Sequence, residues 1–67
     1  MDYMKLFISE LEKGYKECEA YDIISKHYYE FRKEELSDII LEFIYTTKNK
    51  PYLHQEVAQE LKDRYDY

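Results

Sequence analysis

The sequence contains few of the side chains from which a catalytic site could be built. There is one cysteine, Cys18, and there are two histidines, His27 and His54. A thiolate beside an imidazole could act as a nucleophile in covalent catalysis. Cys18, however, lies in the apolar stripe of the first segment, where a free cysteine usually packs as a small hydrophobic residue. We therefore predict that Cys18 is a buried packing residue and not a nucleophile.

One group of residues has the spacing of a metal site. His27, Glu30 and Glu34 stand at i, i+3 and i+7, so they would share one face of a continuous helix, and imidazole and carboxylate groups can bind zinc or iron. Charged side chains are ordinarily found on the solvent-exposed surface, however. The sequence has neither an HExxH motif nor the Glu-x-x-His pairs of di-iron bundles. We therefore predict no metal ligands and no cofactor.

The remaining catalytic motifs are also missing. The serines Ser9, Ser25 and Ser37 do not lie in a GxSxG nucleophile elbow, and the single glycine, Gly14, cannot form a Gly-rich phosphate loop. A chain of this size also leaves little room for a pocket of several hundred Å³. These observations predict that the chain is not an enzyme and has no catalytic residues.

Size and composition indicate one small helical domain over residues 1–67. Hydrophobic residues make up 45% of the chain and charged residues 37%, with one glycine and one proline, so the composition is typical of neither disorder nor a sheet with many hairpins. Abundant Glu, Lys and Leu favour helix. One core of this size supplies only about 3–5 kcal/mol, and natural domains often add a disulfide, a metal or a partner. The partner, another protein or a second copy, is the option that this sequence leaves.

Apolar residues recur at intervals of three and four along most of the chain, which predicts an all-α bundle of three to four short helices. The predicted helices span approximately residues 2–19, 22–33, 36–47 and 53–65. Asp2 and Asp22 are placed to cap the first two helices. A change of phase predicts a break near residues 20–22, and one continuous bent helix is the alternative. Pro51 predicts a loop over residues 48–52.

Two apolar stripes define the expected core most clearly. The stripe of the first helix consists of Met4, Phe7, Ile8, Leu11, Tyr15 and Cys18. The stripe of the third helix consists of Leu36, Ile39, Ile40, Phe43, Ile44 and Thr47.

The charge balance disfavours direct binding to nucleic acid. Ten basic and 15 acidic residues give a net charge of −5, with −3 over residues 1–22, −2 over residues 23–47 and zero over residues 48–67. Phosphate contacts require a basic face, and none of any length is present. We therefore predict no direct contact with nucleic acid and a basic partner.

One segment nevertheless resembles the opening of a helix-turn-helix or winged-helix domain. From Leu36 to Tyr65 a helix is followed by a Lys/Pro turn and by the sequence YLHQEVAQELKDRY, with Ala58 at its centre. The resemblance covers less than half of the chain and implies a role with DNA. Such a role has two forms: a truncated helix-turn-helix DNA binder, or an acidic mimic of DNA. The carboxylates that come closest to replacing phosphates are those of Glu10, Glu17, Glu19 and Asp22.

No segment has the length of a membrane span or a signal peptide. The longest apolar run is three residues, as at residues 39–41, whereas a span needs about 20 apolar residues and a signal peptide a run of roughly 7–15. We expect no membrane segment and a cytoplasmic location, with which a single unpaired cysteine agrees.

Tyrosine is the most unusual feature of the composition, with nine residues and no tryptophan. Tyrosine has an apolar ring with a polar tip, and it is enriched at interface hot spots. Four short helices cannot bury nine tyrosines together with the aliphatic residues. We predict that some members of one group are exposed and mark a protein contact surface. That group is Tyr28, Tyr29, Tyr45 and Tyr52.

Taken together, these features predict a small acidic helical interaction protein that acts as an adaptor, inhibitor or regulator. It would dock on a protein partner or associate with itself. In general character it resembles the small proteins of phages and other mobile elements, including anti-defence and immunity proteins, although no specific motif carries that likeness.

Overall fold

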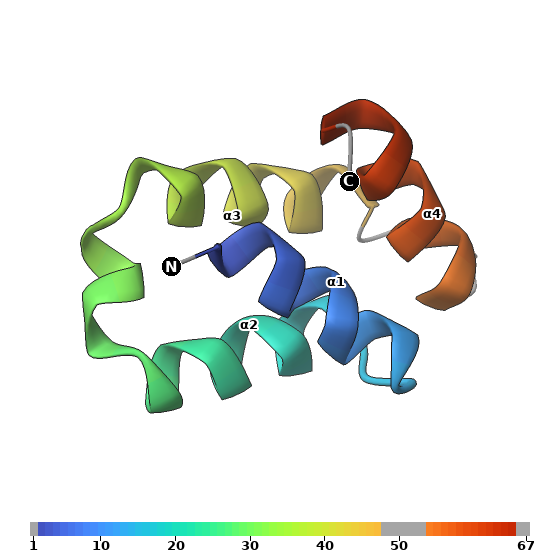
Figure 1. Ribbon diagram of the computed structural model, residues 1–67. Helices are drawn as coiled ribbons and strands as arrows, with labels where there is room; N and C mark the ends of the chain where they lie inside the picture. Colours follow the sequence, from blue (N-terminus) through green and yellow to red (C-terminus); the bar gives the residue numbers. More distant parts are fainter. Residues whose placement is uncertain (1, 48–53, 66–67) are drawn as a thin grey trace.

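The computed structural model describes residues 2–47 and 54–65, which form four α-helices and one 3₁₀ segment (Figure 1). The elements in chain order are α1 (Tyr3–Glu12), α2 (Glu17–His27), the 3₁₀ segment η1 (Tyr29–Lys33), α3 (Glu35–Thr47) and α4 (His54–Tyr65). No strand occurs in this part of the chain. The predicted all-α class, a small bundle of short helices, is confirmed.

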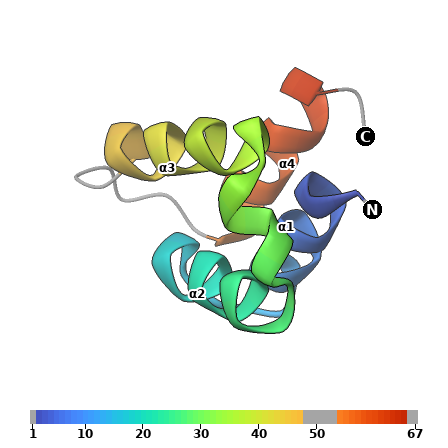
Figure 2. The ribbon, with the colours of Figure 1, turned by 90° about the vertical axis from the view of Figure 1, so that its left-hand side faces the viewer.

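The helix α1 is the central element of the bundle. α2 and α3 run in opposite directions along two sides of the molecule, and η1 joins them at one end (Figure 1). In the view turned by 90°, α3 lies above α2, and α1 lies beside them (Figure 2). α1 makes its most extensive contacts with α4 and α2, and it also contacts α3.

Every element contributes to one core. Nearly complete burial of a Leu, Ile or Phe side chain stabilises the fold by about 1.5–3 kcal/mol. The buried hydrophobic residues are Met4, Phe7, Ile8, Leu11, Ala20, Ile24, Phe31, Ile40, Phe43, Val57, Ala58 and Leu61. The first four belong to α1, and each exposes 3% or less of its surface.

The start of α1 agrees with the sequence prediction, but its end does not. Asp2 caps the helix, since its Oδ1 accepts a hydrogen bond from the Lys5 amide at 3.1 Å. The helix ends at Glu12 because Gly14 takes a positive φ of 106°. The Gly14 amide donates to the Leu11 carbonyl (3.0 Å) and the Tyr15 amide to the Glu10 carbonyl (3.3 Å). These two bonds form a Schellman motif, which closes a helix at a left-handed glycine.

This glycine turn corrects three predictions. The expected helix over residues 2–19 is two helices, and the break lies at residues 13–16 and not near residues 20–22. α2 begins at Glu17, where the Glu19 carboxylate accepts a hydrogen bond from the Lys16 amide at 3.3 Å. Asp22 is therefore an exposed residue in the middle of α2 and caps nothing.

The predicted helix over residues 22–33 is also interrupted. α2 ends at His27, and Tyr28 has a φ of −129°, outside the helical range. The chain then continues as η1, whose Phe31 is fully buried. The Phe31 ring centroid lies 5.2 Å from both the Tyr3 and the Tyr21 ring centroids. Adjacent aromatic residues have modest helix propensity, and the irregular turn lets Phe31 enter the core from the end of the bundle.

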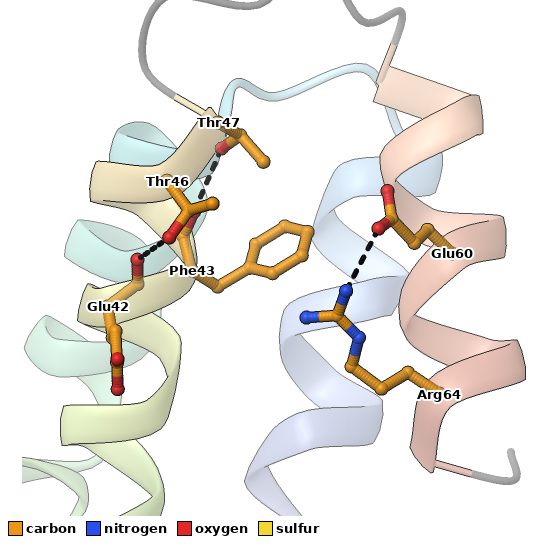
Figure 3. Close-up of polar contacts among 6 residues, drawn as sticks. All are labelled: Glu42, Phe43, Thr46, Thr47, Glu60 and Arg64. Carbon is orange, nitrogen blue, oxygen red and sulfur yellow. Dashed lines mark hydrogen bonds and ion pairs between the residues drawn. The ribbon is translucent and has the colours of Figure 1, made fainter.

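The last two helices lie close to their predicted bounds. α3 begins one residue before the expected residue 36, and α4 begins one residue after the expected residue 53. The buried Thr47 hydroxyl at the end of α3 donates to the Phe43 carbonyl at 3.1 Å (Figure 3), so burial leaves no unsatisfied donor there. The loop predicted over residues 48–52 lies outside the described residues.

An arginine links the outer edges of α3 and α4. The Arg64 guanidinium lies 5.7 Å from the centroid of the Phe43 ring, and its Nη2 atom is 3.1 Å from the Glu60 Oε1 atom (Figure 3). On the other side of α4, the Lys62 ammonium is 3.0 Å from the Glu12 carboxylate of α1. Exposed ion pairs contribute about 0–1 kcal/mol each, so packing and not charge holds α4 in place.

The helices of the described residues are all too short and too polar to cross a bilayer.

The turn at Gly14 predicts opposite effects of two mirror-image substitutions. No atom lies within 4 Å of a Cβ built on Gly14, so L-alanine meets no steric clash and costs only backbone strain. We expect Gly14→Ala to lower the free energy of unfolding by about 1–2 kcal/mol. The variant with D-alanine at position 14, made by chemical synthesis, should have a free energy of unfolding higher by up to about 1 kcal/mol, because D-alanine favours positive φ. Urea titration measures both, and a loss of the same size in both variants would contradict the glycine turn.

The burial of Phe31 predicts a large difference between two aromatic neighbours. Phe31→Ala is expected to cost about 3–5 kcal/mol, which is the whole stability of a domain of this size, so the variant should be largely unfolded by circular dichroism. Tyr29 is 69% exposed, and Tyr29→Ala should cost less than about 1 kcal/mol. Equal losses would mean that η1 does not insert Phe31 into the core.

Candidate functional site

A groove of about 560 Å³ lies between the first half of α2 and the second half of α3. The surface that it exposes is largely apolar. Its lining residues are Lys16, Glu17, Cys18, Glu19, Tyr21, Asp22, Leu41, Ile44 and Tyr45. This groove combines exposed aromatic and aliphatic side chains with charged ones, and it is therefore the candidate site.

The geometry of α3 explains the apolar wall of the groove. Successive residues of an α-helix are rotated by about 100°, so Leu41 and Tyr45 lie on one flank, turned away from the buried Ile40 and Phe43. Ile44 lies between that flank and the core, and it is half-buried. Tyr45 is 72% exposed. Apolar side chains thus continue from the core of the bundle onto an open surface.

The opposite wall comes from the first two turns of α2. Tyr21 is half-buried, and its ring packs against Phe31 of the core. Cys18 and Asp22, one turn apart, are exposed. The wall is therefore apolar at its base, where Tyr21 lies, and polar at its rim.

The charges on the rim are mainly negative and are not neutralised within the fold. Among residues 2–47 and 54–65 no ion pair involves Glu17, Glu19 or Asp22. Among the described residues, Lys16 is the only cation that lines the groove. The groove adjoins the C-terminal end of α3, which carries a partial negative charge, and the N-terminal end of α2, which carries a partial positive charge, so the carboxylates and not the helix dipoles decide the sign of the site. The site therefore favours cationic groups.

The charge of the whole chain is concentrated in the part that forms this site. Residues 17–47, from the start of α2 to the end of α3, contain eight acidic and three basic residues, a balance of −5 that equals the net charge of the chain. The ion pairs Lys13–Glu10, Lys62–Glu12 and Arg64–Glu60 lie elsewhere, on α1, the turn after it and α4. The excess negative charge of the protein therefore lies in α2, η1 and α3.

The four tyrosines, some of which are predicted to be exposed and to mark a contact surface, do not form one cluster. Tyr45 lies in the groove, whereas Tyr29, on η1, is exposed with the Lys33 ammonium 5.1 Å from its ring centroid. Tyr28 is half-buried and packs edge-on against Tyr3 at 5.8 Å. Tyr52 lies outside the described residues. Because η1 adjoins the N-terminal end of α3 and Tyr45 lies near its C-terminal end, about 15 Å of helix separates them.

The prediction that Cys18 is buried is wrong, because the thiol is exposed. The stripe to which it was assigned ends with α1, and Cys18 belongs to α2, beside the groove. Tyr15, which was predicted to belong to the same stripe, also lies outside the core, with 41% of its surface exposed. Sequence reasoning also missed Leu41 as a site residue. Leu41 is apolar but lies outside the predicted stripe of α3, and this was a signal that α3 has a second apolar surface.

The spacing of His27, Glu30 and Glu34 is not realised on one helix. α2 ends at His27, Glu30 lies in η1, and Glu34 follows η1. The His27 Nδ1 atom lies 2.9 Å from the Ile23 carbonyl oxygen. In the described part of the chain, no three His, Cys, Asp or Glu side chains lie together as possible ligands of one ion.

Comparison with known proteins does not extend this description. No protein-family model, curated protein or solved structure matches the chain. The site therefore has to be interpreted from its own geometry.

The segment that resembles a helix-turn-helix contains two helices, α3 and α4, as expected. However, Lys62 and Arg64 of α4 are engaged in ion pairs with Glu12 and Glu60. Cations held in this way do not form the basic reading face that DNA recognition requires. The geometry of α4 therefore does not favour direct DNA binding.

The exposure of Cys18 predicts rapid reaction with thiol reagents. Because the thiol lies at the rim of an open groove, we expect its reaction with an aromatic disulfide in the folded protein to be within about threefold of the rate in urea. Absorbance of the released thiolate measures this rate, and only one site can react because the chain has one cysteine. A folded-state rate slower by a factor of about 100 would place Cys18 in the interior.

Proposed function

We propose that this chain is a small helical interaction protein, of the adaptor or inhibitor type, that binds another protein through the groove between α2 and α3. The observation that carries the proposal is the continuation of the core onto an open surface at Leu41, Ile44 and Tyr45. In a chain of 67 residues, apolar residues outside the core add no burial free energy unless a partner covers them.

The side chains in the groove are of the kind that supplies binding free energy. Tyrosine contributes disproportionately to interfaces because a large rigid ring is buried with little loss of conformational entropy. Tyr45 stands at the edge of the groove with most of its surface in solvent. Covering Tyr45 together with the half-buried Leu41 and Ile44 would remove apolar surface from water at about 25 cal/mol per Å².

The charges around the groove would select the partner. Uncompensated carboxylates accelerate association with a basic surface and disfavour an acidic one. The balance of −5 over residues 17–47, which contain both helices that form the groove, supports this preference. A basic protein is therefore the expected partner.

The same charge observation favours a second candidate function, mimicry of DNA. In that case, the carboxylates of residues 17–47 would occupy the phosphate-binding surface of a nucleic-acid-binding protein. Mimicry and groove docking differ in one respect, because only mimicry requires that duplex DNA and this chain compete for the same surface.

A matched pair of variants tests groove docking. Tyr45→Asp introduces a charge into the apolar wall, and Tyr29→Asp makes the same change at an equally exposed site on η1. We expect a protein retained from the native lysate by the wild type and by Tyr29→Asp to bind Tyr45→Asp at least about tenfold more weakly. Quantitative mass spectrometry of the retained proteins measures this ratio, and circular dichroism verifies that both variants fold.

Three outcomes of this experiment count against groove docking. Equal retention by all three forms would place the contact elsewhere on the surface. Retention of nothing in stoichiometric amount, with a monomer by light scattering, would remove the basis for an interaction protein. Displacement of the retained protein by duplex DNA, together with insensitivity to Tyr45→Asp, would favour mimicry.

A further inference from the structure

We infer that the occupant of the α2–α3 groove is a basic amphipathic helix of the partner protein. Its aliphatic side chains would lie on Leu41, Ile44 and Tyr21, and its Lys or Arg residues would face Glu17 and Asp22. This inference rests on the proposed function and adds to it the secondary structure and the charge pattern of the bound segment.

The secondary structure of the walls selects a helix over a strand. An extended peptide gains affinity by adding to a free sheet edge, and the described residues contain no strand. Both walls of the groove are helices, α2 and α3, whose central backbone groups are already hydrogen-bonded within each helix. Beyond the first turn of α2, whose amides have no intrahelical acceptor, the groove offers side chains, which is the mode used by helices that bind in grooves with anchors at i, i+3 and i+4.

The floor of the groove suits aliphatic anchors. Leu41 and Ile44 supply branched aliphatic surface, and Tyr21 and Tyr45 contribute one ring from each wall. A volume of about 560 Å³ accommodates several side chains of a helix face but not a folded domain. A proline-rich segment would instead use a groove lined chiefly by aromatic rings.

The rim supplies the charge complementarity. Glu17 and Asp22 have no ion-pair partner among the described residues, and the α2 wall carries three carboxylates beside one described lysine, Lys16. A second copy of this chain is a poor occupant, since each copy carries a net charge of −5 and like charges repel. A cationic amphipathic helix of a different protein matches both the carboxylates of the rim and the apolar side chains of the floor.

Designed peptides test this inference on the full chain. The probe is a fluorescent, terminally capped peptide of about 15 residues, with leucines at intervals of three and four and lysines elsewhere. Three controls replace lysine by glutamate, leucine by serine, or the whole peptide by a proline-rich sequence with arginine. In about 50 mM salt the Leu/Lys peptide should bind at least about tenfold more tightly than each control, and about 500 mM salt should weaken its binding.

Cys18 reports where the peptide binds. Because the thiol lies in the lining of the groove, a saturating Leu/Lys peptide should slow its alkylation by iodoacetamide at least about fivefold. The controls at the same concentration should leave the rate unchanged.

Two charge-neutralising double variants distinguish the effect of the carboxylates on the rim of the groove from the effect of the net charge of the protein. Glu17→Gln with Asp22→Asn changes the net charge from −5 to −3, and Glu30→Gln with Glu34→Gln makes the same change outside the groove, on η1 and the residue after it. The first pair should weaken Leu/Lys peptide binding at least about fivefold, and the second less than about twofold. All four side chains are described and lie outside the core.

Several results would overturn the inference. Equal binding of the Leu/Glu or Ser/Lys control would remove the role of charge or of the apolar floor. Tighter binding of the proline-rich control, or an unprotected Cys18, would give the groove another occupant. Protection of Cys18 by rising protein concentration alone would identify that occupant as a second copy. If any of these results is obtained and Tyr45→Asp still loses the captured partner, groove docking would remain supported, and only the helical occupant would be excluded.

Discussion

The burial of α1 among the other helices is the constraint on which the rest of the structure depends. A chain of this length can form only one core, and four of its largest contributions come from a single helix: Met4, Phe7, Ile8 and Leu11. Because α2, α3 and α4 all contact α1, each of them turns one side toward it. Whether an apolar residue is buried therefore depends on which side of its helix it occupies and not only on how apolar it is.

This constraint accounts for the surface that is left open. α3 carries apolar side chains around more of its circumference than one contact with the core can bury, so Leu41 and Tyr45 remain on a flank that α2 only partly covers. The same helices carry the excess of carboxylates, whereas α1 and α4 pair Glu12 with Lys62 across their contact. Apolar exposure and uncompensated charge consequently occur at one place, and this coincidence is what distinguishes the groove from ordinary surface.

Sequence spacing predicted the helical class, the cap at Asp2 and the two later helices closely, because regular apolar intervals report directly on a buried helix face. It failed where backbone conformation decided the outcome. Gly14 lies inside the predicted helix over residues 2–19, yet its positive φ ends α1, and Cys18 consequently lies in the groove and not in the interior. Phe31 lies inside the predicted helix over residues 22–33, although a 3₁₀ turn and not a continuous helix brings it to the core. Which apolar residues of α3 stay outside the core depends on where α2 packs, and no local pattern contains that information.

The contact between Lys62 and Glu12 joins residues 50 positions apart, whereas α1 with α2, α2 with η1 and η1 with α3 are neighbours in the chain. Loop closure costs entropy that grows with the length of chain enclosed, so that cost falls mainly on the docking of α4 against α1. The described residues that line the groove lie between positions 16 and 45, and none of them belongs to α4. The recognition surface therefore depends on the packing of α2 against α3, which encloses a shorter stretch of chain than the docking of α4 against α1.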